Sequence, residues 1–345
     1  MPNQKVILDR GKFLYKCVFN RPKTNSINFT MLSQLSDFIS EASKNQKPLL
    51  FSSKIKNQFS SGVDYEELVS NQQSIIDLHQ EAYILLFKMQ KEVKESISIW
   101  DGNMQGLGAS LASNCKYRVC TDSSAWSMPQ HFLGLVPNLG ATYYLSKIDK
   151  AWGLYLYLTC AVLESFDPYR AGLATHFVKH QDLPQLFEAL DTARSISDVL
   201  EEFHCEPTGY SEYSKYNDHV QKVFEDPQSM EEIMQELYIL ACHDNNFSKR
   251  TRDTLKCLCP LTLKVALEKF KHMETTSFEK VLEDEALLDA RILSSYSQNV
   301  INGVRQRVIH RHHKNRPHWV PETIGEVTQE MVNDLLKPGF KVLKL

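Results

Sequence analysis

The order of the strand-like and helix-like segments most constrains what this chain can fold into. Up to about residue 180, short runs that alternate like strands are followed by segments with apolar residues at helical spacing. Beyond that point, nearly all periodic segments have helical spacing. Strands alternating with helices are typical of an α/β core rather than of a helical bundle. The sequence therefore predicts an α/β core over residues 1–200 and a helical C-terminal region over residues 201–345.

The individual elements are predicted from apolar periodicity and from Gly, Pro and Asn turn signals. In the core we expect two strands within 5–20, helices at 28–42, 65–68, 75–94 and 151–163, and strands at 49–52 and 96–100. In the C-terminal region we expect helices at 184–190, 230–242, 261–273 and 278–296.

Composition limits the class of protein. With 345 residues, 42% of them hydrophobic and 23% charged, the chain can build one large core or two domains. A net charge of −3 gives no overall attraction to nucleic acid. Its eight cysteines lack zinc-type spacing, because Cys257 and Cys259 are separated by a single residue. We expect reduced core thiols, no metal site and no cofactor.

No segment predicts a membrane span. The longest apolar run, at 151–163, is too short to cross a bilayer and is expected to be a buried helix. The first twenty residues alternate like a strand and show neither an apolar signal region nor a clear amphipathic presequence.

The glycine-rich stretch at 101–145 is the natural place for a site. Gly102, Gly106 and Gly108 let backbone N–H groups approach a ligand at the start of a helix, where donors favour developing negative charge. This is an oxyanion pocket in outline. The loops that follow offer amides in place of carboxylates, with Gln130 in one and Asn138 in the next.

A basic segment at 291–318 is a separate signal. No acidic residue falls between Asp289 and Glu322, and the segment holds Arg305, Arg307, Arg311, Lys314 and Arg316. Such a run is usually a solvated face, and the alternative is a surface that contacts RNA phosphates or an acidic partner. A metal site among its histidines is disfavoured, because neither a carboxylate nor a cysteine lies near them.

Several motifs together resemble those of the enoyl-CoA hydratase/isomerase, or crotonase, superfamily. Residues 20–27 resemble the opening signature and residues 59–64 the first oxyanion loop. Gly106-Leu107-Gly108 stands where the family has three glycines, Met128-Pro129-Gln130 where it has Met-Pro-Glu, and residues 134–140 where it has a Pro-Asp-Val-Gly loop. Residues 169–178, 260–264 and 303–305 resemble the 3-hydroxyisobutyryl-CoA hydrolase branch. The resemblance implies a spiral of β-β-α units with a helical C-terminal region.

The resemblance also implies a site. In the family, backbone N–H groups of two glycine loops bind the thioester oxygen, and here they belong to Val63 and Leu107, as vestigial oxyanion positions. The family acids are replaced by Gln130, Asn138 and Ala82. An amide can hold water but cannot take a proton from it near neutral pH, and losing one general base typically costs about 10²–10⁴ in rate.

Two functional hypotheses follow. The first is a catalytically inactive relative that serves as a structural subunit of a large mitochondrial assembly. The ribosomal small subunit in the matrix is the expected assembly, with protein partners and with rRNA contact through the basic segment. The second is an active or weakly active thioester hydrolase in which His131 or Glu81 has taken over as base. A one-residue shift on a helix turns a side chain by about 100°, which favours the first hypothesis.

Overall fold

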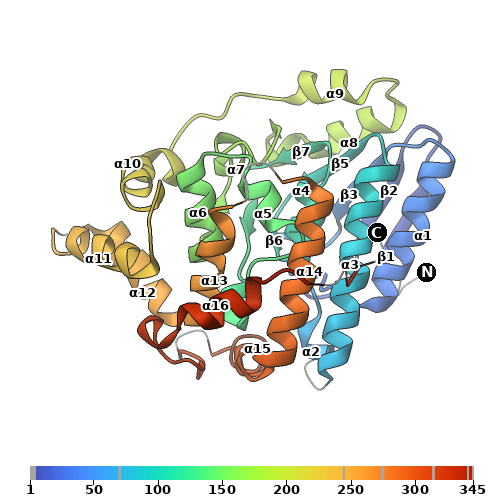
Figure 1. Ribbon diagram of the computed structural model, residues 1–345. Coiled ribbons are helices and arrows are strands. Elements are labelled where there is room, and N and C mark those ends of the chain that lie inside the picture. The colour runs from blue at the N-terminus through green and yellow to red at the C-terminus, as the bar shows by residue number, and fades with distance from the viewer. Residues whose placement is uncertain are drawn as a thin grey trace. The chain divides into compact units, whose positions relative to one another are not determined.

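The computed structural model describes residues 5–68, 71–243, 245–272, 276–312, 315–339 and 342–343. The chain forms two compact units, and neither is a continuous stretch of sequence. The first unit contains Met1–Asp64, Ile84–Ser127 and Val162–Tyr213, and the second contains Tyr65–Tyr83, Met128–Ala161 and Ser214–Leu345. Figure 1 labels many of the helices and strands.

The first unit contains two sheets. The six-stranded sheet has the order β1-β2-β3-β5-β7-β10, and all neighbours in it are parallel except β1 and β2. Its strands are β1 (Val6–Arg10), β2 (Tyr15–Phe19), β3 (Leu49–Ser53), β5 (Ser96–Trp100), β7 (Tyr117–Cys120) and β10 (His176–Phe177). The four-stranded sheet consists of β4 (Gln58–Ser60), β6 (Asn103–Gln105), β8 (Ala125–Ser127) and β9 (Leu163–Glu164), in that order.

The strands follow a repeating β-β-α pattern. Three times in succession, one strand enters the six-stranded sheet, the next enters the four-stranded sheet, and helices follow: β3 with β4, β5 with β6, and β7 with β8. Each repeat adds one parallel strand to each sheet. The predicted spiral of β-β-α units is therefore confirmed.

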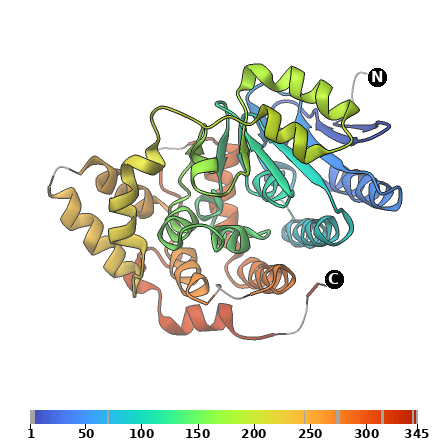
Figure 2. The ribbon, with the colours of Figure 1, turned by 90° about the horizontal axis from the view of Figure 1, so that it is seen from above.

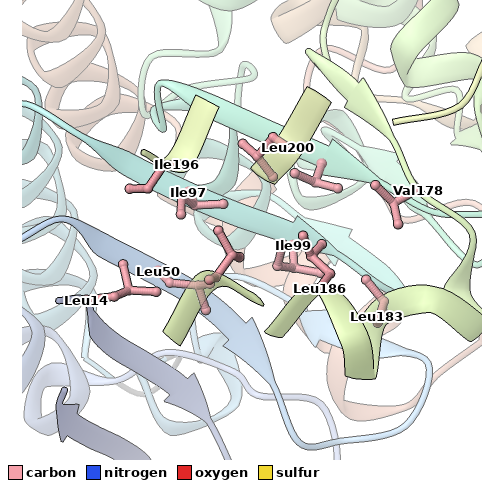
Figure 3. Close-up of a cluster of buried hydrophobic side chains, with 11 residues drawn as sticks. Leu14, Leu50, Ile97, Ile99, Val178, Leu183, Leu186, Ile196 and Leu200 are labelled. Atoms are coloured by element: carbon pink, nitrogen blue, oxygen red, sulfur yellow. The ribbon is translucent and has the colours of Figure 1, made fainter. Parts of the chain in front are cut away.

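One face of the six-stranded sheet is covered by α8 (Leu183–Thr192) and α9 (Ile196–Phe203). Figure 3 shows the cluster of buried side chains between these helices and the strands. Its members are Leu14, Leu50, Ile97, Ile99, Val119, Val178, Leu183, Leu186, Leu190, Ile196 and Leu200. Burying each such side chain contributes roughly 1.5–3 kcal/mol, so this cluster fixes which strand residues face α8 and α9.

The opposite face of the sheet is covered by α1 (Phe29–Lys44), as Figure 2 shows. Successive strand residues point to opposite faces. Tyr15 therefore points away from the Leu14 side, and its ring stacks on Phe38 of α1 at 5.3 Å. Because both faces are covered, β3 and β5 are almost wholly buried, and even Ser96 and Ser98, which alternate with isoleucines in β5, are buried.

The remaining helices of the first unit are α4 (Leu107–Ser113), α7 (Asp167–Arg170) and the 3₁₀ turn η2 (His180–Asp182). A long helix, α3 (Gln72–Glu92), belongs to the second unit up to Tyr83 and to the first from Ile84.

Among its described residues, the second unit contains helices and loops and no strand. Besides the first part of α3, it contains α2 (Tyr65–Leu68), η1 (Gln130–Leu133), α5 (Ala141–Leu145), α6 (Lys150–Thr159), α10 (Glu212–Phe224), α11 (Met230–Ala241), α12 (Asn246–Cys257), α13 (Pro260–Phe270), α14 (Phe278–Ser295), α15 (Ser297–Val304), the π-helical turn η3 (Arg305–Ile309), η4 (Ile324–Glu326) and α16 (Gln329–Leu336). Helix α10 begins at Glu212, in the first unit, and continues in the second unit from Ser214.

Most predicted elements are confirmed within a few residues, including the helical region after residue 200. One prediction, the helix at 151–163, is wrong at its end. Helix α6 stops at Thr159, because Cys160 has a left-handed φ of 56°, and Leu163 begins β9. The boundary near residue 200 stays a prediction, while the first unit as described ends at Tyr213.

All eight cysteines are free, and five of them are buried. Among the described residues, no helix has the length and apolar character needed to cross a membrane.

Candidate active site

In the first unit, the two predicted oxyanion loops lie against each other. Gly62 has a φ of +83°, and a Cβ on it would lie 2.7 Å from the carbonyl oxygen of Gln105 and 3.0 Å from the nitrogen of Leu107. Only glycine therefore allows this approach. Val63 forms a parallel bridge with Ile27 whose hydrogen bonds use Gly62 and Asp64, so its own N–H points away from the bridge.

Leu107 is the first residue of α4, directly after Gly106 at the N-cap. An N–H in the first turn of a helix has no partner within the helix and is therefore a ready donor. Leu107 is fully buried and helical, and its φ is not positive. Val63 and Leu107 thus have the backbone placement expected of oxyanion donors, and that role stays a prediction.

In the second unit, the two amides at the family's acid positions bind each other and a carboxylate. Gln130 Nε2 donates to Asn138 Oδ1 across 3.1 Å, and Asn138 Nδ2 donates to Asp289 Oδ2 across 2.7 Å. Gln130 begins η1, Asn138 lies in the loop before α5, and Asp289 lies on α14. All three side chains are at least 97% buried. The Asp289 carboxylate is therefore hydrogen-bonded to the pair of amides through Asn138.

Helix α3 supplies two more partners of the same carboxylate. His79 and Tyr83, one helical turn apart, place His79 Nδ1 3.0 Å and Tyr83 Oη 2.8 Å from Asp289 Oδ2. Tyr65 Oη lies 2.9 Å from His79 Nε2. Because a carboxylate oxygen accepts hydrogen bonds, His79 donates to Asp289 through Nδ1, and its Nε2 faces the Tyr65 hydroxyl. The result is a buried aspartate–histidine–tyrosine chain.

The tyrosines of this network stay protonated. Burial, together with the charge of Asp289, raises the pKa of Tyr65 and of Tyr83 above the ordinary value. Both hydroxyls are therefore donors at neutral pH, and three donors converge on one oxygen of Asp289. Such an oxygen is suited to an ionised carboxylate.

Two acceptor atoms of the network are left over. Within the described part of the chain, neither Asp289 Oδ1 nor Gln130 Oε1 has a hydrogen-bond partner, and both atoms are buried. Buried acceptors are nearly always bonded, so each has capacity for a donor that approaches it.

A second buried carboxylate lies one turn before Asp289 on α14. Glu285 accepts hydrogen bonds from the backbone N–H of Gly140 at 2.5 Å and of Thr142 at 3.1 Å, and from the Thr142 hydroxyl. Burial raises the pKa of Glu285, an effect opposed chiefly by the charge of Lys269. Glu285 therefore fixes the loop that carries Asn138 to the start of α5, which is a structural role.

The two substitute bases considered from sequence do not join this network. His131 is fully buried, with Nδ1 2.8 Å from Thr262 Oγ1 and Nε2 3.0 Å from the carbonyl oxygen of Tyr157. Burial lowers its pKa to about 3, so it is a neutral core histidine. Glu81 is exposed, and Ala82 is fully buried.

The basic segment is not a uniform free surface. The Arg307 guanidinium lies 4.7 Å from the centre of the Phe132 ring, and Arg316 Nε donates to the carbonyl of Lys256 at 2.9 Å. Arg305 and Arg311 are exposed, and Lys314 lies outside the described residues. Contact with RNA or a partner through these residues stays a prediction. Nor do the described residues contain a group of three or more side chains suited to holding a metal ion.

Four members of the network were missed by reading the sequence: Tyr65, His79, Tyr83 and Asp289. The sequence nevertheless indicates this buried network in two places. Helix α14 carries Glu285 and Asp289 four residues apart within its apolar face, and α3 carries His79 and Tyr83 at the same spacing. Charged side chains on a buried face need partners, so such pairs indicate a buried polar network.

The fold and the motif positions define a class of protein. A family model described as "Enoyl-CoA hydratase/isomerase" matches residues 15–336, and the chain belongs to this family. Solved structures agree in fold: a carnitinyl-CoA dehydratase from Mycobacterium thermoresistibile has a TM-score of 0.89 at 23% identity, with 98% of this chain and 97% of that chain covered. An enoyl-CoA hydratase from Rhodobacter sphaeroides 2.4.1 has a TM-score of 0.86 at 22% identity, with 97% and 98% covered.

The curated relatives narrow the resemblance to one branch. The mitochondrial 3-hydroxyisobutyryl-CoA hydrolase of Dictyostelium discoideum is 28% identical over 97% of this chain and 92% of its own length. The protein of the same name from Bos taurus is 28% identical over 96% of this chain and 88% of its own length. The predicted resemblance to the crotonase superfamily and to its hydrolase branch is therefore confirmed.

These relatives correct the prediction that the chain is not an enzyme. Proteins named as hydrolases align with nearly the whole chain, which favours an enzyme over an inactive scaffold. The prediction counted Gln130, Asn138 and Ala82 as a complete loss of acid–base groups. It did not include the carboxylate of Asp289, which is bonded directly to Asn138.

Proposed function

We propose that this chain is an acyl-CoA thioester hydrolase and that 3-hydroxyisobutyryl-CoA is its substrate. The observation that carries the proposal is the alignment of nearly the entire chain with proteins of that named activity. The alignment runs through the helical C-terminal region, as the family match to residue 336 also does. The resemblance is thus to the whole hydrolase and extends beyond its sheet core.

The polar network supports the same proposal. Thioester hydrolysis needs a group that can accept a proton from water, and amides cannot do so near neutral pH. Asp289 is a buried carboxylate within the second unit, 2.7 Å from the amide nitrogen of Asn138. In this proposal the N–H groups of Val63 and Leu107 bind the thioester oxygen, and the relatives' mitochondrial names lead us to propose the mitochondrial matrix as the location.

The test is release of free thiol from 3-hydroxyisobutyryl-CoA by the purified chain. An unbranched acyl-CoA measures selectivity, and an enoyl-CoA tests hydration as the competing reaction of the family. We expect catalytic thiol release that is fastest with 3-hydroxyisobutyryl-CoA. Hydration of the enoyl-CoA without thiol release from any thioester would overturn the proposal in favour of a hydratase.

A second role, compatible with catalysis, is attachment to a large mitochondrial assembly such as the ribosomal small subunit. The exposed side chains of Arg305 and Arg311, in a segment without acidic residues, support this proposal. Native size fractionation of mitochondrial extract tests it. Co-migration with ribosomal small subunits that is lost in an Arg305→Glu, Arg311→Glu variant is expected, and migration of the unaltered chain at its own size contradicts it.

A further inference from the structure

The second unit contains a cavity that the proposed hydrolysis does not use. It lies between α13, α14 and the end of α16, and its volume is about 360 Å³. Small-molecule sites in proteins typically have volumes of roughly 300–1,000 Å³. All of its lining residues are described and belong to the second unit, so the cavity lies within one compact unit.

Lys269 of α13 lines this cavity and is almost fully enclosed. Only 7% of the residue is exposed, and among the residues that the structure describes its ammonium group has neither a hydrogen bond nor an ion pair. An enclosed charge without a partner is costly, and buried lysines are nearly always paired. The ammonium group can therefore take a negatively charged partner that enters the cavity.

The buried carboxylates of α14 act on Lys269 without contacting its ammonium group. Burial lowers the pKa of Lys269, and the charge of Glu285 is the chief opposing effect. Both Glu285 oxygens, however, accept hydrogen bonds from the start of α5. Asp289 Oδ2 accepts its three hydrogen bonds from α3 and from Asn138. Within the described part of the chain, the Lys269 ammonium group thus lacks a counter-ion in contact with it.

The two acidic side chains that line the cavity are already paired. Asp284 pairs with Lys280 at 2.7 Å, and Glu268 pairs with Lys271 at 3.5 Å. Arg291, which also lines the cavity, donates to backbone carbonyl groups at and after the end of α16 rather than to an acid. The lining therefore has an excess of positive charge, which favours an anion.

The apolar part of the lining indicates the body of such an anion. Four leucines and a proline contribute to it, and they are Leu287, Leu288, Leu335, Leu336 and Pro338. The described lining residues include no Phe, Tyr or Trp, so the cavity offers no aromatic platform for a nucleobase. One enclosed ammonium group matches a single negative charge. A carboxylate carries one, whereas a phosphomonoester carries about 1.5–2 at neutral pH.

We propose that this cavity binds a small aliphatic monocarboxylate whose carboxylate pairs with Lys269. The leucine side chains contact the aliphatic chain of the ligand and remove it from water. The carboxylate accepts a charge-assisted hydrogen bond from the enclosed ammonium group, which is about twice as strong as a bond between neutral groups. This binding site goes beyond the proposed hydrolase, and its existence does not depend on that activity.

Calorimetric titration of the full chain with hexanoate tests the inference, with hexanamide as the uncharged probe of the same length. Hexanoate is expected to bind, and hexanamide is expected to bind at least tenfold more weakly, because it lacks the charge. Lys269→Met removes the ammonium group and keeps an unbranched side chain, so Kd for hexanoate is expected to rise about tenfold or more. Lys249→Met on α12 is the matched control, because Lys249 is exposed and lies outside the lining. Its Kd is expected to equal that of the unaltered chain.

A second variant keeps the inference testable if Lys269→Met does not fold. Leu287→Trp leaves Lys269 in place and adds bulk at a half-buried lining position, so it is also expected to weaken hexanoate binding. No binding of hexanoate, or equal binding by the unaltered chain and Lys269→Met, would overturn the inference. Hexanamide binding as tight as that of hexanoate would also overturn it, and tighter binding of hexyl phosphate would overturn the choice of a carboxylate. None of these outcomes bears on thiol release, which tests the proposed function separately.

Discussion

Asn138 and Asp289 are 151 positions apart in the chain, yet Asn138 Nδ2 donates a 2.7 Å hydrogen bond to Asp289 Oδ2. One residue stands at a family acid position and carries an amide, and the other comes from a helix near the C-terminus and carries the carboxylate. The contact places an acid beside the position where the resemblance expects one. Loss of the family aspartate is therefore compatible with acid–base chemistry.

Restoring the family residue is expected to destabilise this protein. Asn138→Asp would place a second carboxylate against Asp289 and replace a donor by an acceptor, so two like charges would share one buried site. We expect the free energy of unfolding at neutral pH to fall by about 1–3 kcal/mol in urea titrations. Asn333→Asp on the exposed side of α16 is the control. Equal stability of Asn138→Asp and the unaltered chain would contradict the geometry.

His131 makes stability depend on pH. Its pKa is lowered by burial from an ordinary 6.5 to about 3, so between these values the unfolded chain binds a proton there and the folded chain does not. The stabilising contribution is complete above the ordinary value and is lost as the pH falls through this window. The unfolding free energy of His131→Gln, followed by urea titration, is expected to depend less steeply on pH. The exposed control His272→Gln should retain the original slope, and an unchanged slope in His131→Gln would contradict burial of a neutral imidazole.

Removing the Glu285 carboxylate is expected to loosen the loop that carries Asn138. Glu285→Ala leaves the N–H groups of Gly140 and Thr142 and the Thr142 hydroxyl without their acceptor. A buried group that loses its partner costs about 1–3 kcal/mol, so the unfolding free energy should fall by at least that amount. Asp284→Ala in the same turn measures the effect of losing an outward-facing carboxylate. Similar losses in both variants would argue against the capping role.

The approach of the two oxyanion loops is tested at Gly62. Gly62→Ala adds a Cβ 2.7 Å from the Gln105 carbonyl oxygen at a φ of +83°, so both conformation and space oppose it. We expect a loss of about 3 kcal/mol, together with reduced thiol release. Gly209 has a positive φ, but a Cβ there would have no atom within 4 Å, so Gly209→Ala measures the conformational cost alone. Gly325→Ala is the control without a positive φ or a close contact. Thermal unfolding should rank the three variants in that order of damage.

The fold was largely predictable because its signals are local. The apolar residues of β3, the alternating serines and isoleucines of β5, and the helical spacing of α1 and α14 all lie within single segments. The short strands of the four-stranded sheet were missed, because β4, β6 and β8 have three residues each and occur in stretches that resemble loops. Such strands are defined by pairing with one another, which no single segment shows.

The site was predictable only in part. Motif spacing identified Gln130 and Asn138, but the carboxylate that they lead to comes from a contact in three dimensions. His79 and Asp289 are 210 residues apart in sequence, and nothing in either segment alone indicates that they meet. The buried charge on the apolar face of α14 was the available signal, and its partners became clear only from the structure.

The most direct test of the account is hydrolysis of 3-hydroxyisobutyryl-CoA by the purified chain in water enriched in oxygen-18, followed by mass spectrometry. Attack of water on the thioester carbonyl predicts catalytic release of CoA thiol and a product acid that carries the heavy oxygen. An unaltered chain that yields neither free CoA nor labelled acid would contradict the account.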